Sequence, residues 1–425
     1  MKLEAKTFKP FLDMMSQSRG KFIGANIFGN LLPLLIAPIL TRLYSPEDFG
    51  NYAIYFASIS ILGSIGSLSL QNAVFVCDRE GDAADLCIAA ILVGLIVCSL
   101  FSLLISINNS ALVNLFLGTV LNEHIYLLIG SVYLVTLYAC LYSLALRVGF
   151  YGVLTKNKLV LSVALAILQI GIGVHVGGAY GLILANFIGI FLSIVLIAPS
   201  IFDVLKNSIK KYSVKKLYRQ LFRYSHFMLY TAPATLVNTL SSSGPELVIK
   251  MLFGASSVGH YSLANRMLSA PLNFISGAMQ DIFRERAASE GRNNGSYKET
   301  FNLFFILTAC VSCALIIPVA VFAPVLFKII FGLEWEESGY ITQSLAFLVI
   351  VRFVSSPLSY VWILRERQKE DLVWQVGLML ITFASLGFTY LIDAVVPLRD
   401  VILLYSLAAG VWYLFCLWIS SRWAH

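Results

Sequence analysis

LYSPEDFGNY, at residues 43–52, recurs 209 residues later as LFGASSVGHY, at residues 252–261. The leucine, the glycine and the tyrosine of the two copies coincide. Polar residues in the flanking apolar segments keep the same offset, with Asn26, Asn30, Ser60, Ser64, Ser67 and Gln71 mapping onto Thr235, Thr239, Ser269, Asn273, Ser276 and Gln280. Steps of three and four place each polar set on one helix face. The sequence therefore predicts two repeats with polar helix faces, an arrangement from which membrane transporters build a central site.

Apolar residues dominate the chain: 58% of its residues are hydrophobic, 12% are charged, and the mean hydropathy is +0.82. A soluble core could not hide so much apolar surface. Twelve apolar segments approach the ~20 residues that cross the hydrocarbon of a bilayer. They lie at about 22–43, 50–75, 87–107, 125–147, 159–176, 180–200, 225–252, 259–283, 299–323, 338–364, 372–392 and 400–420. We expect an all-α polytopic membrane protein with about twelve transmembrane helices, six in each repeat.

The distribution of Lys and Arg predicts the orientation, because cytoplasmic loops retain basic residues. With the N-terminus inside, every basic residue lies on a cytoplasmic segment except Arg42, Lys250, Arg266, Lys328, Arg352 and Arg399. Both termini are therefore expected in the cytoplasm, and the net charge of +7 reflects topology rather than nucleic-acid binding. Residues 1–21 lack the apolar core of a removable signal peptide. The seven cysteines fall in spans or on the cytoplasmic side, so no disulfide framework is expected.

This pattern divides the chain into five segments. They are a cytoplasmic N-terminal segment (1–21), an N-lobe with spans 1–6 (22–200), a basic cytoplasmic linker (201–224), a C-lobe with spans 7–12 (225–420) and a cytoplasmic tail (421–425). The linker interleaves basic and apolar residues, which is typical of a helix lying on the inner membrane surface. Either it fixes topology and anchors to anionic lipid, or it collects a lipid substrate that bears pyrophosphate.

Motifs for enzyme chemistry or metal binding are weak. Gly254 and Gly259 have the spacing of a phosphate loop, but His260 and Tyr261 replace the Lys and Ser/Thr that such a loop needs. The CxxC of residues 310–313 lies in an apolar span without partner ligands, which favours simple packing. The five histidines are scattered. We expect no cofactor, no metal and no catalytic residue.

Charges inside the predicted spans are more informative, because a mid-membrane Arg costs about 2.5–3.5 kcal/mol even on insertion scales. Arg352 lies near the middle of span 10, and Arg266 lies on the polar face of span 8 that includes Asn273. Span 7 carries a matching stripe that reaches Glu246, with Lys250 four residues beyond it in the favourable pairing direction. Each of these charges either has a structural partner inside the bundle or contacts a substrate.

The candidate substrate-binding residues combine these charges with the polar stripes. They are Arg266, Arg352, Lys250, Glu246, Asn30, Ser64, Gln71, Asn238, Asn273 and Gln280. Basic side chains suit pyrophosphate or acidic sugars. The amides and hydroxyl groups suit the hydroxyl groups of sugars.

IAPILTRLYSPEDFGNYA, at residues 36–53, resembles the first-span signature of bacterial polysaccharide-export proteins of the O-antigen flippase type. Residues 224–233 and 254–264 resemble the opening of the second half in the same family. The resemblance covers all twelve predicted spans, and its motifs are more specific for the multidrug/oligosaccharidyl-lipid/polysaccharide exporter superfamily than for a substrate. It implies two pseudo-symmetric six-helix lobes around a central cavity that opens alternately to each side. Cationic residues hold no fixed motif positions in this family, so Arg266 and Arg352 are assigned from their depth.

The resemblance implies a transporter that flips an undecaprenyl-pyrophosphate-linked oligosaccharide, an O-antigen or related surface polysaccharide unit, across the bacterial cytoplasmic (inner) membrane. Its expected partners are the lipid-linked oligosaccharide, membrane lipids, and the glycan polymerase and chain-length regulator of the same pathway, without nucleic acid. A multidrug or metabolite antiporter of the same superfamily is an alternative, but cation export favours acidic groups, and Glu246 is the only carboxylate well inside a predicted span. A membrane glycan polymerase is a further alternative, although the external loops are short for a catalytic domain.

Overall fold

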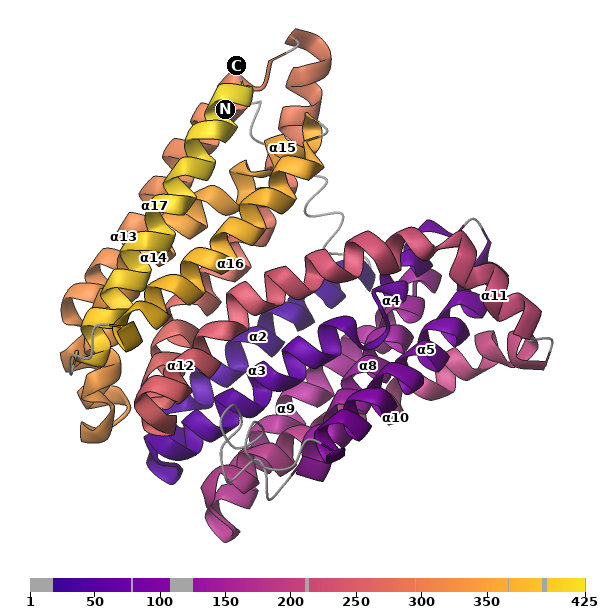
Figure 1. Cartoon of the computed structure of the whole chain (residues 1–425), viewed down its shortest axis with the longest axis horizontal. Helices are drawn as coiled ribbons and strands as arrows, with labels where there is room; N and C mark the ends of the chain where they lie inside the picture. Colours follow the sequence, from indigo (N-terminus) through magenta and orange to yellow (C-terminus); the bar gives the residue numbers. More distant parts are fainter. Residues whose placement is uncertain are drawn as a thin grey trace. The chain divides into compact units, whose positions relative to one another are not determined.

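The computed structural model describes residues 18–77, 79–107, 125–210, 214–294, 296–365, 367–391 and 396–424. These residues form helices joined by short turns, without a strand among them (Figure 1). Most of the predicted N-terminal segment, the predicted external loop around 108–124 and the last residue of the predicted tail lie outside the described residues. The all-α prediction is confirmed for the part of the chain that the structure describes.

Two compact units divide the chain, and unit 1 comprises residues 1–36 and 55–239. Its core is an apolar cluster in which α5, α8 and α10 pack together, with Leu86, Leu144 and Ile197 fully buried. The helices that contribute to unit 1 are α2 (Ser18–Leu43), α3 (Pro46–Gly66), α4 (Leu70–Ala73), η1 (Val74–Val76), α5 (Glu80–Ile107), α8 (Ile125–Val148), α9 (Tyr151–His175), α10 (Gly178–Lys210), α11 (Val214–Arg223) and η2 (Phe227–Thr231).

Unit 2 comprises residues 37–54 and 240–425, so the first hairpin turn of the chain belongs to the unit that contains the second repeat. A cluster around Phe283, Phe304 and Leu358 forms its buried core. Its helices are α12 (Ala232–Asn294), α13 (Lys298–Ile330), η3 (Leu333–Trp335), α14 (Glu336–Leu358), α15 (Tyr360–Leu364), α16 (Gln368–Leu391) and α17 (Leu398–Ala424). Helices α2, α3 and α12 each contribute residues to both units.

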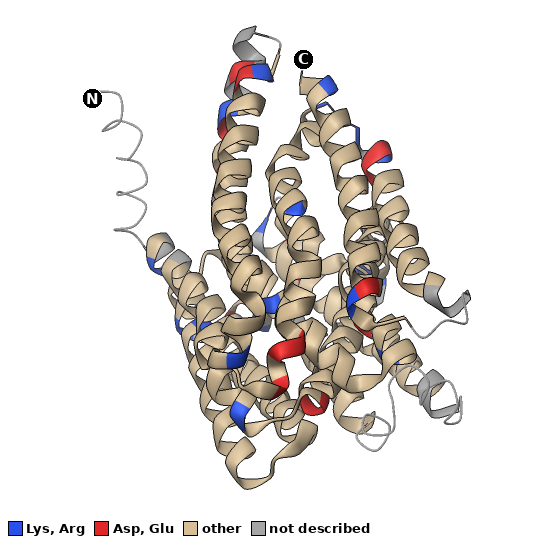
Figure 2. Cartoon of the chain, turned by 90° about the vertical axis from the view of Figure 1, so that its left-hand side faces the viewer, with Lys and Arg blue, Asp and Glu red and all other residues tan. Residues whose placement is uncertain are grey.

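Nine of the described helical segments are long and apolar enough to cross a membrane, and α3 with α4 and η1 forms a tenth that is bent by 56°. Charged residues are correspondingly sparse along the helices (Figure 2). The chain is therefore a multi-pass membrane protein. The count of twelve stays a prediction, because its two further spans are the arms of α12 on either side of Gly254, whose polar stripes lower their hydropathy.

The two copies of the repeated stretch make their turns by different chemistry. In the first copy, the Ser45 hydroxyl accepts a hydrogen bond from the Asp48 amide (3.2 Å), and the Asp48 carboxylate accepts one from the Ser45 amide (3.0 Å). This reciprocal cap, with Pro46 as the first helical residue, starts α3. In the second copy, Gly254 breaks α12 with φ 83° and ψ 175°, a conformation that favours glycine.

The coincident glycines of the two copies pack against each other within unit 2. A Cβ on Gly50 would lie 1.7 Å from the Ala255 carbonyl oxygen, and a Cβ on Gly259 would lie 1.9 Å from the Pro46 carbonyl oxygen. Ala255 lies 209 residues after Pro46, so the contact is reciprocal and has the offset of the repeat. No side chain fits at either position, which explains why glycine occurs in both copies.

Trp335 of the second repeat packs against the turn of the first copy. Its side chain is 1% exposed, and its indole N–H donates to the Thr41 carbonyl (3.2 Å). The ring packs edge-on against Phe49 and His260, with centroids 5.0 and 5.7 Å away. Residues of both repeats therefore share one buried aromatic cluster in unit 2.

The described part of the predicted basic linker, residues 201–224, is mostly helical. Helix α10 continues to Lys210, and α11 begins at Val214. The leucines of α11, Leu217 and Leu221, pack on the core of unit 1 rather than facing outward. Lys216 forms an ion pair with Asp85 of α5 (2.7 Å). Among the described side chains of α11, the exposed apolar ones are Tyr218 and Phe222, whose aromatic rings suit a membrane interface.

Candidate functional site

Glu246 lies within electrostatic reach of Arg266 although the two residues are on opposite sides of the break in α12. In a continuous helix these two residues would be about 30 Å apart, because each residue adds 1.5 Å of rise. Gly254 turns the chain between them, and the Arg266 guanidinium acts electrostatically on the Glu246 carboxyl group. Both side chains are half-buried. Glu246 therefore has a cationic neighbour that the sequence analysis did not assign to it.

Glu246 is nevertheless incompletely satisfied. Its Oε2 atom is buried and accepts no hydrogen bond from the described residues. A buried carboxylate oxygen without a donor is costly, so this position favours an additional hydrogen-bond donor. Lys250, which the sequence predicts as its partner, lies one turn further along α12 and is half-buried.

Arg352 occupies a different setting on α14. It lies twelve residues before the end of the apolar segment Leu333–Leu364, which corresponds to about 18 Å of helix. Its neighbours are the hydroxyl groups of Tyr261, Tyr405 and Tyr413. Among the described residues Arg352 has no ion-pair partner, and its side chain is exposed. A phenol can accept a hydrogen bond from a guanidinium but does not neutralise it.

The tyrosines connect these charges into one group. Tyr261 of α12 and Tyr405 of α17 interact through their hydroxyl groups, and both lie in the electrostatic field of Glu246 and of Arg352. We call Glu246, Tyr261, Arg266, Arg352, Tyr405 and Tyr413 the charged cluster. It is built from α12, α14 and α17 of unit 2 and contains two cations for one carboxyl group. Such a group can hold an anion and supply phenolic donors around it.

The remaining predicted residues lie apart from this cluster in the described contacts. In unit 2, Asn273 is exposed and Gln280 is half-buried further along α12. In unit 1, Asn30 and Asn238 are exposed, whereas the Ser64 hydroxyl donates to the Ile61 carbonyl (2.7 Å) and the Gln71 amide oxygen accepts from Ser67. No hydrogen bond among the described residues joins these polar side chains of unit 1 to one another.

Part of the span-8 stripe is a packing seam. Ser276 is 8% exposed, and its hydroxyl donates to the Ser356 hydroxyl of α14 (3.3 Å). Small polar residues commonly join helices in this way inside membranes. The exposed amide of Asn273, one turn before Ser276, remains the member of this stripe that is best placed to meet a ligand.

Sequence reasoning missed the three tyrosines and one lysine. Tyr261 did carry a signal, since it is the repeated tyrosine that matches Tyr52, but Tyr405 and Tyr413 lie in an apolar segment without a motif. Lys158 was assigned to a loop before a span starting near residue 159. Helix α9 begins at Tyr151, so Lys158 lies inside the helix, with its side chain against Gly29 of α2.

The fold and this cluster define a class: a polytopic helical protein with the architecture of a membrane transporter. A family model described as "Polysaccharide biosynthesis protein" matches residues 39–339. The chain therefore belongs to the polysaccharide biosynthesis protein family, and the resemblance stated above is confirmed at this level.

Individual relatives agree with this assignment. The teichuronic acid biosynthesis protein TuaB of Bacillus subtilis (strain 168) is 24% identical over 168 residues, which are 40% of this chain and 34% of that protein. The match thus spans about a third of the length of this curated relative.

Solved structures of the MOP superfamily share the fold. The lipid II flippase MurJ in an inward closed conformation has a TM-score of 0.71 at 14% identity, covering 94% of this chain and 87% of MurJ. An inward-facing multidrug resistance transporter of the MATE family has a TM-score of 0.69 at 14% identity, covering 93% and 95%. At these identities the likeness shows the fold, which is that of MOP-superfamily transporters and flippases.

Proposed function

We propose that the protein flips an undecaprenyl-pyrophosphate-linked oligosaccharide, an O-antigen or related surface polysaccharide unit, across the bacterial cytoplasmic membrane by alternating access. Both termini lie in the cytoplasm in this proposal, in line with the distribution of Lys and Arg. The glycan polymerase and chain-length regulator of the same pathway would act on the unit after it has been flipped. The family and the flippase fold support this class of substrate.

The observation that carries the proposal is the state of Arg352. A guanidinium about 18 Å from the end of an apolar helical segment must be neutralised or hydrated. Tyrosine hydroxyl groups surround it, and no carboxylate among the described residues pairs with it. A pyrophosphate or an acidic sugar supplies the missing charge, and the planar guanidinium can bind two of its oxygens at once.

Glu246 and Arg266 act differently in this proposal. Because Glu246 already offsets part of the positive charge of Arg266, Arg266 attracts a substrate anion less strongly than Arg352 does. An arriving anion would compete with Glu246 for Arg266, and the Glu246 carboxyl group could take up a proton in exchange. This arrangement couples anion binding to proton binding at one helix hairpin without a nucleotide.

The experiment compares Arg352→Ala and Arg352→Lys in cells that lack the native copy of the protein. We expect Ala to abolish surface glycan at normal membrane abundance, and Lys to restore a fraction, because it keeps the charge but loses the planar fork. Arg399→Ala is the matched control, since Arg399 lies near a helix start beside Asp400 (3.5 Å). Normal glycan at normal abundance in Arg352→Ala would overturn the proposal.

Export of organic cations is the second candidate, and the incompletely satisfied carboxyl group of Glu246 is the observation that favours it. In that case Glu246→Gln would abolish resistance to cationic drugs, whereas Arg352→Ala would not reduce it. The excess of cations over carboxyl groups in the charged cluster favours the anionic substrate instead.

A further inference from the structure

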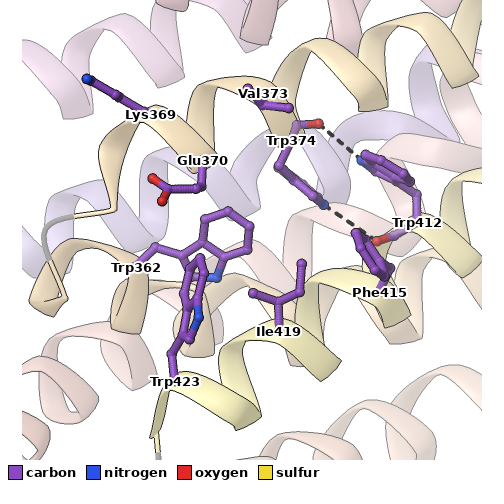
Figure 3. Close-up of a pocket in the computed structure, with 9 residues that line it drawn as sticks. All are labelled: Trp362, Lys369, Glu370, Val373, Trp374, Trp412, Phe415, Ile419 and Trp423. Atoms are coloured by element: carbon purple, nitrogen blue, oxygen red, sulfur yellow. Dashed lines mark hydrogen bonds between the residues drawn. The ribbon is translucent and has the colours of Figure 1, made fainter.

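A pocket of about 280 Å³ lies within unit 2, among α15, α16 and α17. Four of the six tryptophans of the chain line it: Trp362, Trp374, Trp412 and Trp423. Figure 3 shows the indole rings gathered around the pocket, with Lys369 extending away from them. The pocket and the charged cluster share no residue, although the Trp374 ring packs edge-on against Tyr413 of the cluster, with centroids 5.1 Å apart.

Three of the four indole N–H groups donate hydrogen bonds within the protein. Trp412 donates to the Trp374 carbonyl (3.1 Å) and Trp374 donates to the Trp412 carbonyl (3.5 Å), as the dashed lines in Figure 3 show. Trp362 donates to the Ser420 hydroxyl (2.6 Å), and its ring meets Trp423 edge-on with centroids 4.9 Å apart. The walls therefore present ring carbons to a ligand. A sugar would find few donors here, whereas a hydrocarbon chain would find close contact on several sides.

The surface around the pocket is also apolar. Val373, which lines the pocket, is 70% exposed, and Phe415 is 43% exposed. In a membrane protein, exposed side chains of this kind meet lipid rather than water. A ligand of this pocket thus enters from the bilayer.

Cationic side chains surround the same end of α16 and α17. The Arg365 Nε donates to the Trp423 carbonyl (2.8 Å), and Arg367 lies over the Trp423 ring, 5.6 Å from its centroid. Lys369 and Arg422 belong to the same group, with Arg422 stacked over Trp418 at 4.0 Å. The described acidic side chains nearby are Glu370, which pairs with Arg367 (2.8 Å), and Asp371, which accepts from Gln375. The cationic excess favours an anionic headgroup beside an apolar chain.

We propose that the tryptophan pocket seats part of the isoprenoid chain of the lipid-linked substrate before the headgroup reaches the charged cluster, with the phosphate at the basic residues of this end. The inference rests on the proposed function. The volume lies at the small end of ligand pockets and suits one chain. A polyprenyl phosphate presents one chain and one concentrated charge, and its methyl branches and double bonds pack closely against indole faces. A membrane phospholipid instead brings two chains per headgroup.

Photolabelling of the full-length protein in lipid nanodiscs tests this directly, using a polyprenyl phosphate with a diazirine on its chain. We expect the labelled peptides to lie within residues 362–423. Undecaprenyl phosphate should compete with the labelling, whereas phosphatidylglycerol at the same concentration should not. Val373→Trp should reduce labelling at least fivefold, because the larger side chain fills the mouth of the pocket without removing a buried one. Ile329→Trp on α13 is the matched control at 69% exposure and should label normally.

Three results would overturn the proposal: labelling spread evenly over the chain, unchanged labelling of Val373→Trp, or equal competition by phosphatidylglycerol, which would mark a site for bulk lipid. The labelling assay measures occupancy of the pocket and the surface-glycan assay measures transport, so the two proposals are tested by different readouts. Failure of the pocket proposal appears as unchanged labelling of Val373→Trp, whereas failure of the flippase proposal appears as normal surface glycan in Arg352→Ala.

Discussion

The two repeats share their turns but differ in charge at equivalent positions. Glu246, Arg266 and Arg352 of the second repeat correspond, at the offset of 209, to Ala37, Ala57 and Ser143 of the first. The three residues of the first repeat are 3%, 2% and 7% exposed, whereas those of the second are half-buried or exposed. The two repeats therefore share their turns, whereas the charges at these three positions occur only in the second repeat.

The largest effect should come from breaking what the repeats share. In Gly259→Leu the new side chain would meet the Pro46 carbonyl oxygen, which already lies 1.9 Å from the position of a Cβ. Backbone cannot move aside as a flexible side chain can, so we expect most of the protein to be lost from the membrane. Quantitative immunoblotting of membranes measures this loss.

Gly387→Ala is the control for that variant, because a Cβ at Gly387 meets nothing within 4 Å. It should match or slightly exceed wild-type abundance, since alanine favours a helix interior by about 0.5–1 kcal/mol. Wild-type abundance of Gly259→Leu would show that the glycine crossing is not needed for the fold.

A somewhat smaller effect is expected when a charge of the second repeat is copied into the first. Ser143→Arg places a guanidinium at the buried counterpart of Arg352, where we expect a cost of at least about 2.5–3.5 kcal/mol. The melting temperature of the purified protein in detergent should fall, while Ser143→Ala should change it little. An unchanged melting temperature in Ser143→Arg would mean that both repeats tolerate charge at this position.

The pair within the charged cluster should show a moderate coupling. Arg266→Ala removes the neighbour of Glu246 and should lower the free energy of unfolding by about 1–3 kcal/mol, less than for a fully buried pair because both side chains are half-buried. Adding Glu246→Gln to that variant should recover most of the loss. Chemical denaturation of the wild type, the two single variants and the double variant measures the coupling. If the changes in the free energy of unfolding simply add, Glu246 and Arg266 do not interact.

The smallest effect concerns a cap that follows the predicted span 8. The Glu290 carboxylate accepts the amides of Glu299 (3.0 Å) and Thr300 (2.9 Å) at the start of α13. Burial raises the pKa of Glu290, but the hydrogen bonds from Thr300 and Glu299 outweigh it and hold the pKa below its ordinary value of 4.5. Because the folded-state pKa is the lower one, the stabilisation is complete above pH 4.5 and is lost as the pH falls through the folded-state pKa.

Glu290→Gln should therefore lower the free energy of unfolding by about 0.3–1 kcal/mol at pH 7 and by less near pH 4. Glu285→Gln on the exposed surface of the same helix is the control. If Glu290→Gln lowers the free energy of unfolding equally at both pH values, the negative charge of Glu290 does not contribute to the cap.

Sequence patterns predicted the helices and the shared turns well, because both depend on local chemistry. Both the capping pair Ser45 and Asp48 and the repeated glycines can be recognised from their spacing in the sequence. The family resemblance followed from the same stretch. The start of α9 was missed by several residues, because Lys156 and Lys158 look like loop residues when burial is unknown.

The sequence predicted the three charged members of the charged cluster, but neither its tyrosines nor its contacts. Depth in an apolar segment singled out Arg266 and Arg352, whereas the neighbour of Glu246 depends on how the chain turns at Gly254. Periodicity favoured Lys250, which is adjacent along one helix. Tyr405 and Tyr413 come from α17, far away in sequence, and no local pattern connects them to Arg352.

An assay of the purified protein in liposomes measures flipping of the lipid-linked oligosaccharide itself. Liposomes contain a fluorescent undecaprenyl-pyrophosphate-linked oligosaccharide in both leaflets, and a glycosidase is added outside. Lipid that starts in the inner leaflet is cleaved only after it has been flipped to the outer leaflet, so the cleaved fraction is followed over time. We expect flipping by the wild type, loss of at least tenfold in rate for Arg352→Ala, partial recovery for Arg352→Lys and a wild-type rate for Arg399→Ala. Equal rates for wild type and Arg352→Ala, or no flipping above that of protein-free liposomes, would contradict the proposed function.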